Sequence, residues 1–321
     1  MRFAVVGTNF ISDNFCIAAS SAENASVTAV FSRAKESGKK FAEKYGIGKV
    51  YTDYASMLCD GEIDAVYIAS PTMCHAEQAI AALYAGKDVL CEKMISASYS
   101  EFLKMKDAAN ITGKVLIEAM RPDFDEILLS VSKSIEKIGE IKEVRLEYCQ
   151  YSSRYDKFLA GDIMNAFDPA MKNSALADIG IYPLHFAVSL FGAPKTISSE
   201  GVFLHNGFLG SGVSVLSYDG YDVRIEYSKI REGQNISRII GNNGEISFNK
   251  INEPTYYIIK SANGDAKTYH APEDKSNMVS EISEFVRICE CNRKRGEELL
   301  AVTEKTMAAV DGIYKSLGVD F

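Results

Sequence analysis

The stretch that constrains this chain most is its beginning, where an apolar run ends at a glycine and a helical pattern follows. Residues 3–6 have the continuous hydrophobicity of a fully buried strand. Gly7 ends that run, and apolar residues then recur at helical spacing through Phe15. A strand, a tight turn and a helix in this order bind the pyrophosphate of a dinucleotide, because the start of the helix offers N–H groups and partial positive charge.

The glycine pattern of this turn is incomplete. The dinucleotide fingerprint is Gly-x-Gly-x-x-Gly/Ala, and this chain has Gly7, Asn9 and Ser12 at the three positions. Asn is the non-glycine residue that best tolerates a left-handed backbone, and Ser is small enough for close packing of helix on strand. We interpret the stretch as a cofactor turn, with the buried first strand of any α/β domain as the alternative. The residues expected at the cofactor are Gly7, Thr8, Asn9, Phe10 and Ile11.

Composition limits the classes of protein that fit. The chain has 321 residues, of which 47% are hydrophobic and 24% charged, so two ordinary globular domains are expected. A net charge of −8 argues against nucleic acid or an anionic membrane as a partner. No apolar run reaches the length of a membrane span, and no signal peptide precedes the first strand. The seven scattered cysteines favour free thiols in a reducing cytoplasm and no metal site.

Strands alternate with helices through the first 120 residues. After the first strand, the expected strands are residues 27–31, 49–51, 63–69, 88–91 and 114–117. Continuous apolar strands separated by helices predict a doubly wound parallel sheet, the Rossmann fold, over residues 1–120. Ligands of such sheets bind beyond the carboxyl ends of the strands. The polar and turn residues at those ends are Ser70, Pro71, His75, Glu92, Lys93 and Glu118.

Each of these strand-end residues also has a simpler interpretation. His75 could cap a helix, and Glu118 could be a structural hydrogen-bond acceptor. Lys93 is harder to explain that way, because a lysine directly after a buried strand needs a partner or a cleft.

The end of the second strand bears on the choice of cofactor. An acidic residue there would bind the ribose 2′-hydroxyl of NAD, whereas this chain has Ser32 and Arg33. A hydroxyl and a guanidinium suit a 2′-phosphate, which favours NADP(H) and leaves NAD(H) possible. The alternative is a solvated arginine at a helix start.

The pattern changes after Pro122, which marks the expected domain boundary. Residues 121–321 are predicted to form an α+β domain with an open, mainly antiparallel sheet. Its expected strands are residues 141–151, 214–218, 223–227, 237–240, 245–248 and 255–259, and its last helices are residues 278–289 and 298–317. Residues 152–172 are expected to be an irregular loop near a cleft.

A helix predicted over residues 173–190, which Pro183 would bend or divide into two segments, carries the most unusual side chains of this half. Asp178, Tyr182 and His185 stand at i, i+4 and i+7, so they share one helix face. An acid, a phenol and an imidazole beside an apolar face indicate a site, with a buried tyrosine and its aspartate partner as the alternative.

Several motifs together resemble the glucose–fructose oxidoreductase, inositol dehydrogenase and rhizopine catabolism (Gfo/Idh/MocA) family. They occur in family order over essentially the whole chain, and the specific ones are the Glu-Lys pair and the Asp-x-Gly-x-Tyr helix. The motifs are residues 7–9, Ser70-Pro71 with His75, Glu92-Lys93, Glu118-Ala119 with Arg121, and residues 178–185. Two departures are Met94 in place of the usual proline and Lys172-Asn173-Ser174 where the family is often glycine-rich.

The resemblance implies roles for individual residues. Lys93 would lie by the nicotinamide and substrate and polarise the reacting oxygen, Tyr182 would transfer the proton, and Asp178 would orient the lysine or a substrate hydroxyl. The proton-transfer role could fall instead to Lys93, because coupled groups share their titration. His185 occupies a place that often touches substrate, and Glu118 and Arg154 are further candidates for substrate contact.

The expected function is therefore reversible hydride transfer between NAD(P) and a carbinol or carbonyl carbon of a sugar, polyol or related small molecule. Two alternatives stay open: a nucleotide-binding sensor without turnover, and glycoside cleavage through transient oxidation. The resemblance also implies a homodimer or homotetramer formed through the sheet of the second domain.

Overall fold

A computed structural model describes residues 1–272 and 276–319, and the chain divides into two compact units. The first comprises Met1–Met120 and Ser276–Ala301, and the second Arg121–Lys275 and Val302–Phe321. Residues 276–301 therefore group with the first unit, whereas the sequence predicted a single boundary after residue 120. The reason is that helix α9 (Asn277–Cys291) packs on the first sheet, with Phe285 against Phe3 at 5.8 Å between ring centroids. That the units are separate domains stays a prediction.

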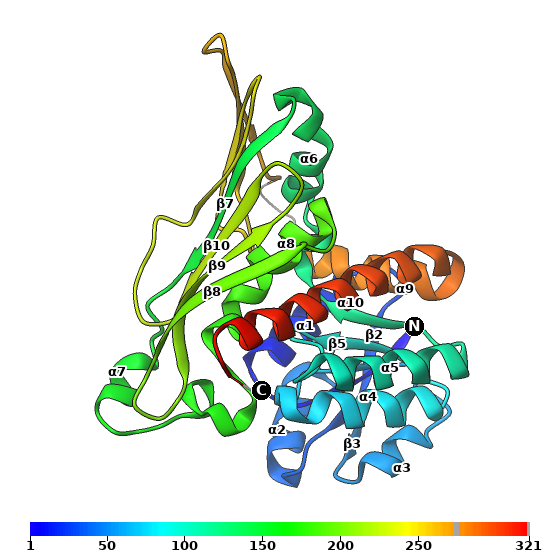
Figure 1. The fold of residues 1–321 in the computed structure, drawn as a ribbon. Helices are drawn as coiled ribbons and strands as arrows, with labels where there is room; N and C mark the ends of the chain where they lie inside the picture. The colour runs from blue at the N-terminus through cyan, green and yellow to red at the C-terminus, as the bar shows by residue number, and fades with distance from the viewer. Residues whose placement is uncertain (273–275, 320–321) are drawn as a thin grey trace. The chain divides into compact units, whose positions relative to one another are not determined.

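The first unit contains a six-stranded parallel sheet, as expected. Its order is β3-β2-β1-β4-β5-β6, which is the doubly wound order of dinucleotide-binding folds. The strands are β1 (Arg2–Val6), β2 (Ser26–Phe31), β3 (Lys49–Tyr51), β4 (Ala65–Ile68), β5 (Asp88–Glu92) and β6 (Leu116–Ala119). The helices that join them are α1 (Phe10–Ala19), α2 (Lys35–Tyr45), α3 (Tyr54–Leu58), α4 (His75–Tyr84) and α5 (Tyr99–Thr112). Figure 1 shows α4 and α5 lying side by side along this sheet.

The second unit contains an eight-stranded sheet, which confirms the α+β class. Its order is β14-β13-β12-β11-β7-β10-β9-β8, and every neighbouring pair is antiparallel except β7 with β10. The strands are β7 (Ile141–Cys149), β8 (Thr196–Phe203), β9 (Leu209–Ser217), β10 (Asp222–Ser228), β11 (Ile236–Gly241), β12 (Gly244–Asn249), β13 (Tyr256–Ser261) and β14 (Ala266–His270).

One face of this sheet is covered by helices. They are α6 (Glu126–Ser134), a π-helical turn (Leu176–Gly180) and α8 (Ile181–Phe191), visible in Figure 1. Alternation along the strands explains this cover: Val144 and Leu146 of β7 are buried beneath the helices, whereas Arg145 between them is exposed. The last helix, α10 (Arg293–Ser316), begins before the expected residue 298.

The segment expected to be an irregular loop is partly ordered. Residues 155–159 form the short helix α7 (Tyr155–Leu159), and two 3₁₀ turns follow it. Aromatic packing accounts for this order, because Phe158, Phe167 and Phe208 form a buried cluster.

Within residues 1–272 and 276–319, no helix is long and apolar enough to cross a membrane. Within the same residues, no three His, Cys, Asp or Glu side chains are grouped to hold a metal ion.

Candidate active site

The strands of the first unit end together at one edge of the sheet. Val6 lies opposite Phe31 and Ile68, and Ile68 lies opposite Cys91. The residues that follow these strands therefore leave the sheet at the same edge, where a doubly wound sheet binds its ligand. All the expected cofactor residues belong to this edge or to the helices that begin there.

Gly7 occupies the most restricted position of this edge. Its φ is +108°, and a Cβ atom there would lie 2.8 Å from the carbonyl oxygen of Ala69. Both features exclude a side chain, since L-residues rarely adopt such a φ and a backbone oxygen cannot move aside cheaply. The turn thus brings β1 and β4 closer than any other residue would allow.

Asn9 does not take the left-handed conformation expected of it. It is extended, with φ −92°, and caps helix α1. Its Oδ1 accepts from the N–H groups of Ile11 at 3.0 Å and Ser12 at 3.2 Å, and its Nδ2 donates to Ala69 O at 2.7 Å. A phosphate at this turn would compete with Asn9 for two helix N–H groups. Ser12 is fully buried, in agreement with its expected role in close packing.

Ser32 and Arg33 follow β2 as expected, with different exposure. The Ser32 hydroxyl is buried and donates to the carbonyl of Ala34 at 3.0 Å, whereas Arg33 is exposed. The guanidinium is therefore the group of this pair that can reach a ligand in solvent.

His75 connects two strand ends. The ring is buried, with Nε2 2.8 Å from Ser70 O and Nδ1 3.0 Å from Met94 O. Burial lowers the pKa of this imidazole, although the two carbonyl groups oppose that effect. The ring thus lies between the end of β4 and the segment after β5, and in its neutral form it donates to one of the two carbonyls. It is therefore more than a helix cap.

Two buried carboxylates support the same edge. Glu92 Oε1 accepts from the Tyr67 hydroxyl at 2.6 Å, and Glu118 Oε1 accepts from the N–H of Ile95 at 2.9 Å. Glu118 is therefore a structural acceptor, the alternative considered from the sequence, and its substrate contact stays a prediction. Between them, Lys93 is half-buried, and the Lys93–Met94 peptide bond is cis.

In the second unit, Asp178 and Tyr182 lie on different kinds of helical turn. Asp178 belongs to the π-helical turn and Tyr182 to the first turn of α8, so residues 175–191 are helical as expected but begin with a π turn in place of regular α-helix. The turn packs tightly on β10, where a Cβ at Gly180 would lie 2.7 Å from the ring of Tyr227. Such π turns often occur at functional sites.

Each of these two side chains is held by a cation of its own unit. Asp178 Oδ2 lies 2.8 Å from the ammonium of Lys229, and the Tyr182 hydroxyl accepts from Arg121 Nη2 at 3.3 Å. The ring of Tyr148 lies beside Tyr182, with 5.8 Å between centroids. Lys229 is a residue of this site that was not expected from the sequence, although it follows a buried strand just as Lys93 does.

His185 and Arg154 lie in different surroundings. His185 is fully buried, with Nε2 2.9 Å from the carboxylate of Asp123 and Nδ1 3.3 Å from the hydroxyl of Thr306. These contacts favour a role in joining η2 (Arg121–Phe124), α8 and α10 over the substrate contact that the resemblance implies. Arg154 is exposed at the start of α7, and its expected contact with substrate stays a prediction.

The fold and the strand edge define a class of protein, and comparison with known families agrees. Residues 1–120 match the family described as "Oxidoreductase family, NAD-binding Rossmann fold", and residues 134–247 match the "GFO/IDH/MocA C-terminal domain". The chain is an oxidoreductase with an NAD(P)-binding Rossmann fold. It belongs to the Gfo/Idh/MocA family.

Curated relatives span the whole chain. It is 39% identical to scyllo-inositol 2-dehydrogenase (NADP(+)) IolU of Bacillus subtilis, over 99% of this chain and 98% of that protein. It is 27% identical to mouse trans-1,2-dihydrobenzene-1,2-diol dehydrogenase, over 100% and 98%. Among solved structures, the 3-ketoreductase KijD10 of Actinomadura kijaniata has the same fold, with a TM-score of 0.85 at 22% identity over 99% and 98% of the two chains.

Proposed function

We propose that this chain is an NADP(H)-dependent dehydrogenase that oxidises a secondary hydroxyl of a cyclic polyol and catalyses the reverse reduction. The observation that carries the proposal is the paired arrangement in the second unit, where an ammonium holds Asp178 and a guanidinium holds Tyr182. A fixed carboxylate and a phenol beside a cation are suited to binding hydroxyl groups and moving a proton.

The residues of the first unit fit a dinucleotide. Gly7 leaves room where a Cβ would press on Ala69, and a pyrophosphate would take the place of Asn9 Oδ1 at the N–H groups of Ile11 and Ser12. The exposed guanidinium of Arg33 would pair with a 2′-phosphate, which supports NADP(H) over NAD(H). The chemistry that the bound nicotinamide supplies is the acceptance and return of a hydride.

The protein side chains would move the proton and hold the substrate. Tyr182 would take the proton of the reacting hydroxyl, and the hydrogen bond that Arg121 Nη2 donates to its oxygen at 3.3 Å holds the phenol in place. Lys93 would polarise the same oxygen of the substrate. Asp178 would accept hydrogen bonds from neighbouring hydroxyl groups, since an ionised carboxylate only accepts.

The polyol assignment has two supports. An anionic acceptor selects substrates with hydroxyl donors over carboxylates, which it would repel. The curated relative that shares 39% of its residues is named a scyllo-inositol dehydrogenase that uses NADP(+).

Purified protein tests the proposal when nicotinamide absorbance is followed with NADP⁺ and with NAD⁺. The panel should include scyllo-inositol, an aldose and a trans-dihydrodiol. Reduction of NADP⁺ by the cyclic polyol is expected. Dinucleotide binding without turnover of any substrate would favour the sensor alternative, and cleavage of a glycoside by protein that retains NAD would favour the hydrolytic one.

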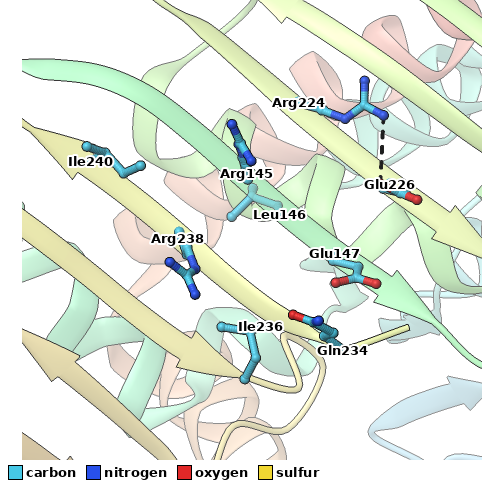
Figure 2. A pocket seen from close by; sticks show the side chains of 9 residues that line it. All are labelled: Arg145, Leu146, Glu147, Arg224, Glu226, Gln234, Ile236, Arg238 and Ile240. Carbon is cyan, nitrogen blue, oxygen red and sulfur yellow. Dashed lines mark ion pairs between the residues drawn. The ribbon is translucent and has the colours of Figure 1, made fainter. Parts of the chain in front are cut away.

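We further propose that two copies associate through the outer face of the second unit's sheet. An open depression of about 420 Å³ lies there. Figure 2 shows the side chains that line it, most of them from β7, β10 and β11. Arg145 lies opposite both Arg224 and Arg238 in the strand register, and Glu147 lies opposite Glu226 in the next outward row. A two-fold axis between an arginine row and a glutamate row would place each row against its opposite charge.

A further inference from the structure

Lys229 is a buried cation that the proposed chemistry does not use directly. It follows β10 and has 4% of its surface exposed. Buried lysines are rare, because removing the ammonium from water is costly unless partners replace the lost solvation. Lys229 must therefore have partners that replace water around its ammonium.

The ammonium of Lys229 is surrounded by three kinds of partner. It lies 2.8 Å from Asp178 Oδ2 and donates to the carbonyl of Ala166 at 2.7 Å. The rings of Phe167 and Phe208 lie 4.8 Å and 5.3 Å from Nζ, within the range of cation–π attraction. Carboxylate, carbonyl and two aromatic faces together replace water around the charge.

The backbone of Lys229 is fixed as well. Its N–H donates to Gly210 O at 2.9 Å, and its carbonyl accepts from the N–H of Ser152 at 3.0 Å. The carboxylate partner is different, since the side chain of Asp178 is 36% exposed. A rigid, buried cation thus holds a carboxylate that still faces solvent.

We propose that Lys229 is a positioning residue for the reaction, which keeps Asp178 ionised and aims its carboxylate at the substrate. The same ammonium joins that carboxylate to the segment between α7 and the π-helical turn through Ala166 and Phe167. The orientation of Asp178 therefore depends on the packing of the aromatic cluster. This inference rests on the proposed role of Asp178 in binding substrate hydroxyls.

The main test compares Lys229→Met and Lys229→Gln with the wild type. We expect kcat/KM for the polyol to fall about tenfold or more, because a charged hydrogen bond is worth ~1.5–3 kcal/mol. The acidic limb of its pH profile should move to higher pH, since Asp178 loses the charge that favours ionisation. Lys87→Met is the matched control: Lys87 is also buried, but it donates only to the carbonyls of Asp60 and Ile63, each at 2.8 Å.

A carboxyl-carbon NMR titration gives a readout that needs no activity. The Asp178 signal, identified by its absence in Asp178→Asn, should titrate at higher pH in Lys229→Gln than in the wild type. If the single Lys229 variants do not fold, the wild-type titration is compared with that of Phe208→Leu, which removes one aromatic face and keeps Lys229. A shift of the Asp178 signal supports the coupling, and an unchanged signal contradicts it.

A double variant separates positioning from a purely structural contact. In the Asp178→Asn background, Lys229→Met should lower kcat/KM no further, because the two residues act as one unit. Folded Lys229 variants with wild-type kcat/KM and pH profile would overturn the inference. Absence of turnover in the wild type would instead overturn the proposed function, so the two failures are distinguishable.

Discussion

Gly7 and Asn9 explain how the turn after β1 forms without two of the glycines of the dinucleotide fingerprint. Gly7 remains at the one place where a side chain would meet the carbonyl of Ala69. Asn9 is extended and supplies a helix cap, so no left-handed residue is needed there. The order of strand, turn and helix expected from the sequence is present. The conformation expected for Asn9 was wrong, because an amide side chain supports capping as well as left-handed backbone.

Substitution Gly7→Ala should destabilise the fold and weaken cofactor binding. The added Cβ meets a backbone oxygen at 2.8 Å on top of an unfavourable φ, so a loss of about 2–4 kcal/mol in unfolding free energy is expected. Gly46→Ala is the control, because Gly46 has φ +68° with open space around its Cβ position. It should cost only about 1 kcal/mol. Urea unfolding measures the unfolding free energy of both variants. Equal losses in Gly7→Ala and Gly46→Ala would mean that the contact with Ala69 O does not add to the cost.

Substitution Arg33→Ala tests the choice of cofactor. Loss of a charge-assisted contact to the 2′-phosphate should raise the KM for NADP⁺ about tenfold to a hundredfold and leave that for NAD⁺ nearly unchanged. The control is Lys40→Ala, an exposed cation of the same helix region. If Arg33→Ala raised the KM for NADP⁺ and the KM for NAD⁺ equally, the guanidinium would not be binding the 2′-phosphate.

At the scale of elements, the sequence predicted which segments form strands and helices better than how those elements are joined. Strand β5 was expected over residues 88–91 and is Asp88–Glu92, because its apolar run is uninterrupted. The π-helical turn before α8 was not foreseen, since the apolar spacing of residues 173–190 also fits one continuous helix. What produces it is tertiary: Gly180 packs on the ring of Tyr227, which lies on a distant strand.

The connection that His75 makes between β4 and β5 should depend on pH. Burial lowers the pKa of the folded imidazole below its ordinary 6.5, so the unfolded chain takes up a proton that the folded chain does not. The stability that neutral His75 contributes is therefore present above pH 6.5 and is lost as pH falls below it.

Urea unfolding at about pH 7.5 and about pH 5.5 measures this effect in the wild type and in His75→Gln. The variant keeps a hydrogen-bond donor but cannot titrate, so its stability should fall less between the two pH values. An equal fall in both proteins would mean that His75 is not the group responsible.

At the scale of the whole molecule, the sequence predicted one parallel sheet and one mainly antiparallel sheet, and both are present. It did not predict which sheet each later helix packs against. The unexpected assignment is α9, which follows the second sheet in sequence yet packs with the first unit through Phe285. Its apolar face at helical spacing predicts burial but does not say against which sheet. Likewise, the ion pair of Asp178 with Lys229 joins residues 51 positions apart (229 − 178), beyond what local spacing can indicate.

The proposed association through the outer sheet face makes a charge-swap prediction. Arg145→Glu combined with Arg224→Glu and Arg238→Glu makes both outward rows acidic, and Glu147→Arg with Glu226→Arg makes both basic. Each variant alone should be monomeric in sedimentation, because like rows would meet across the two-fold axis. An equimolar mixture should form dimers. Wild-type association by either variant alone would place the interface elsewhere.

If Tyr182 takes the proton while a hydride passes from the polyol to NADP⁺, the Tyr182→Phe variant should lose turnover. The measurement is kcat for NADP⁺ reduction by scyllo-inositol in the wild type and the variant, with Tyr148→Phe as the control from the same ring pair. Tyr182→Phe should lower kcat about a hundredfold or more, whereas Tyr148→Phe should stay near the wild-type rate. Near-wild-type turnover in folded Tyr182→Phe would contradict the account.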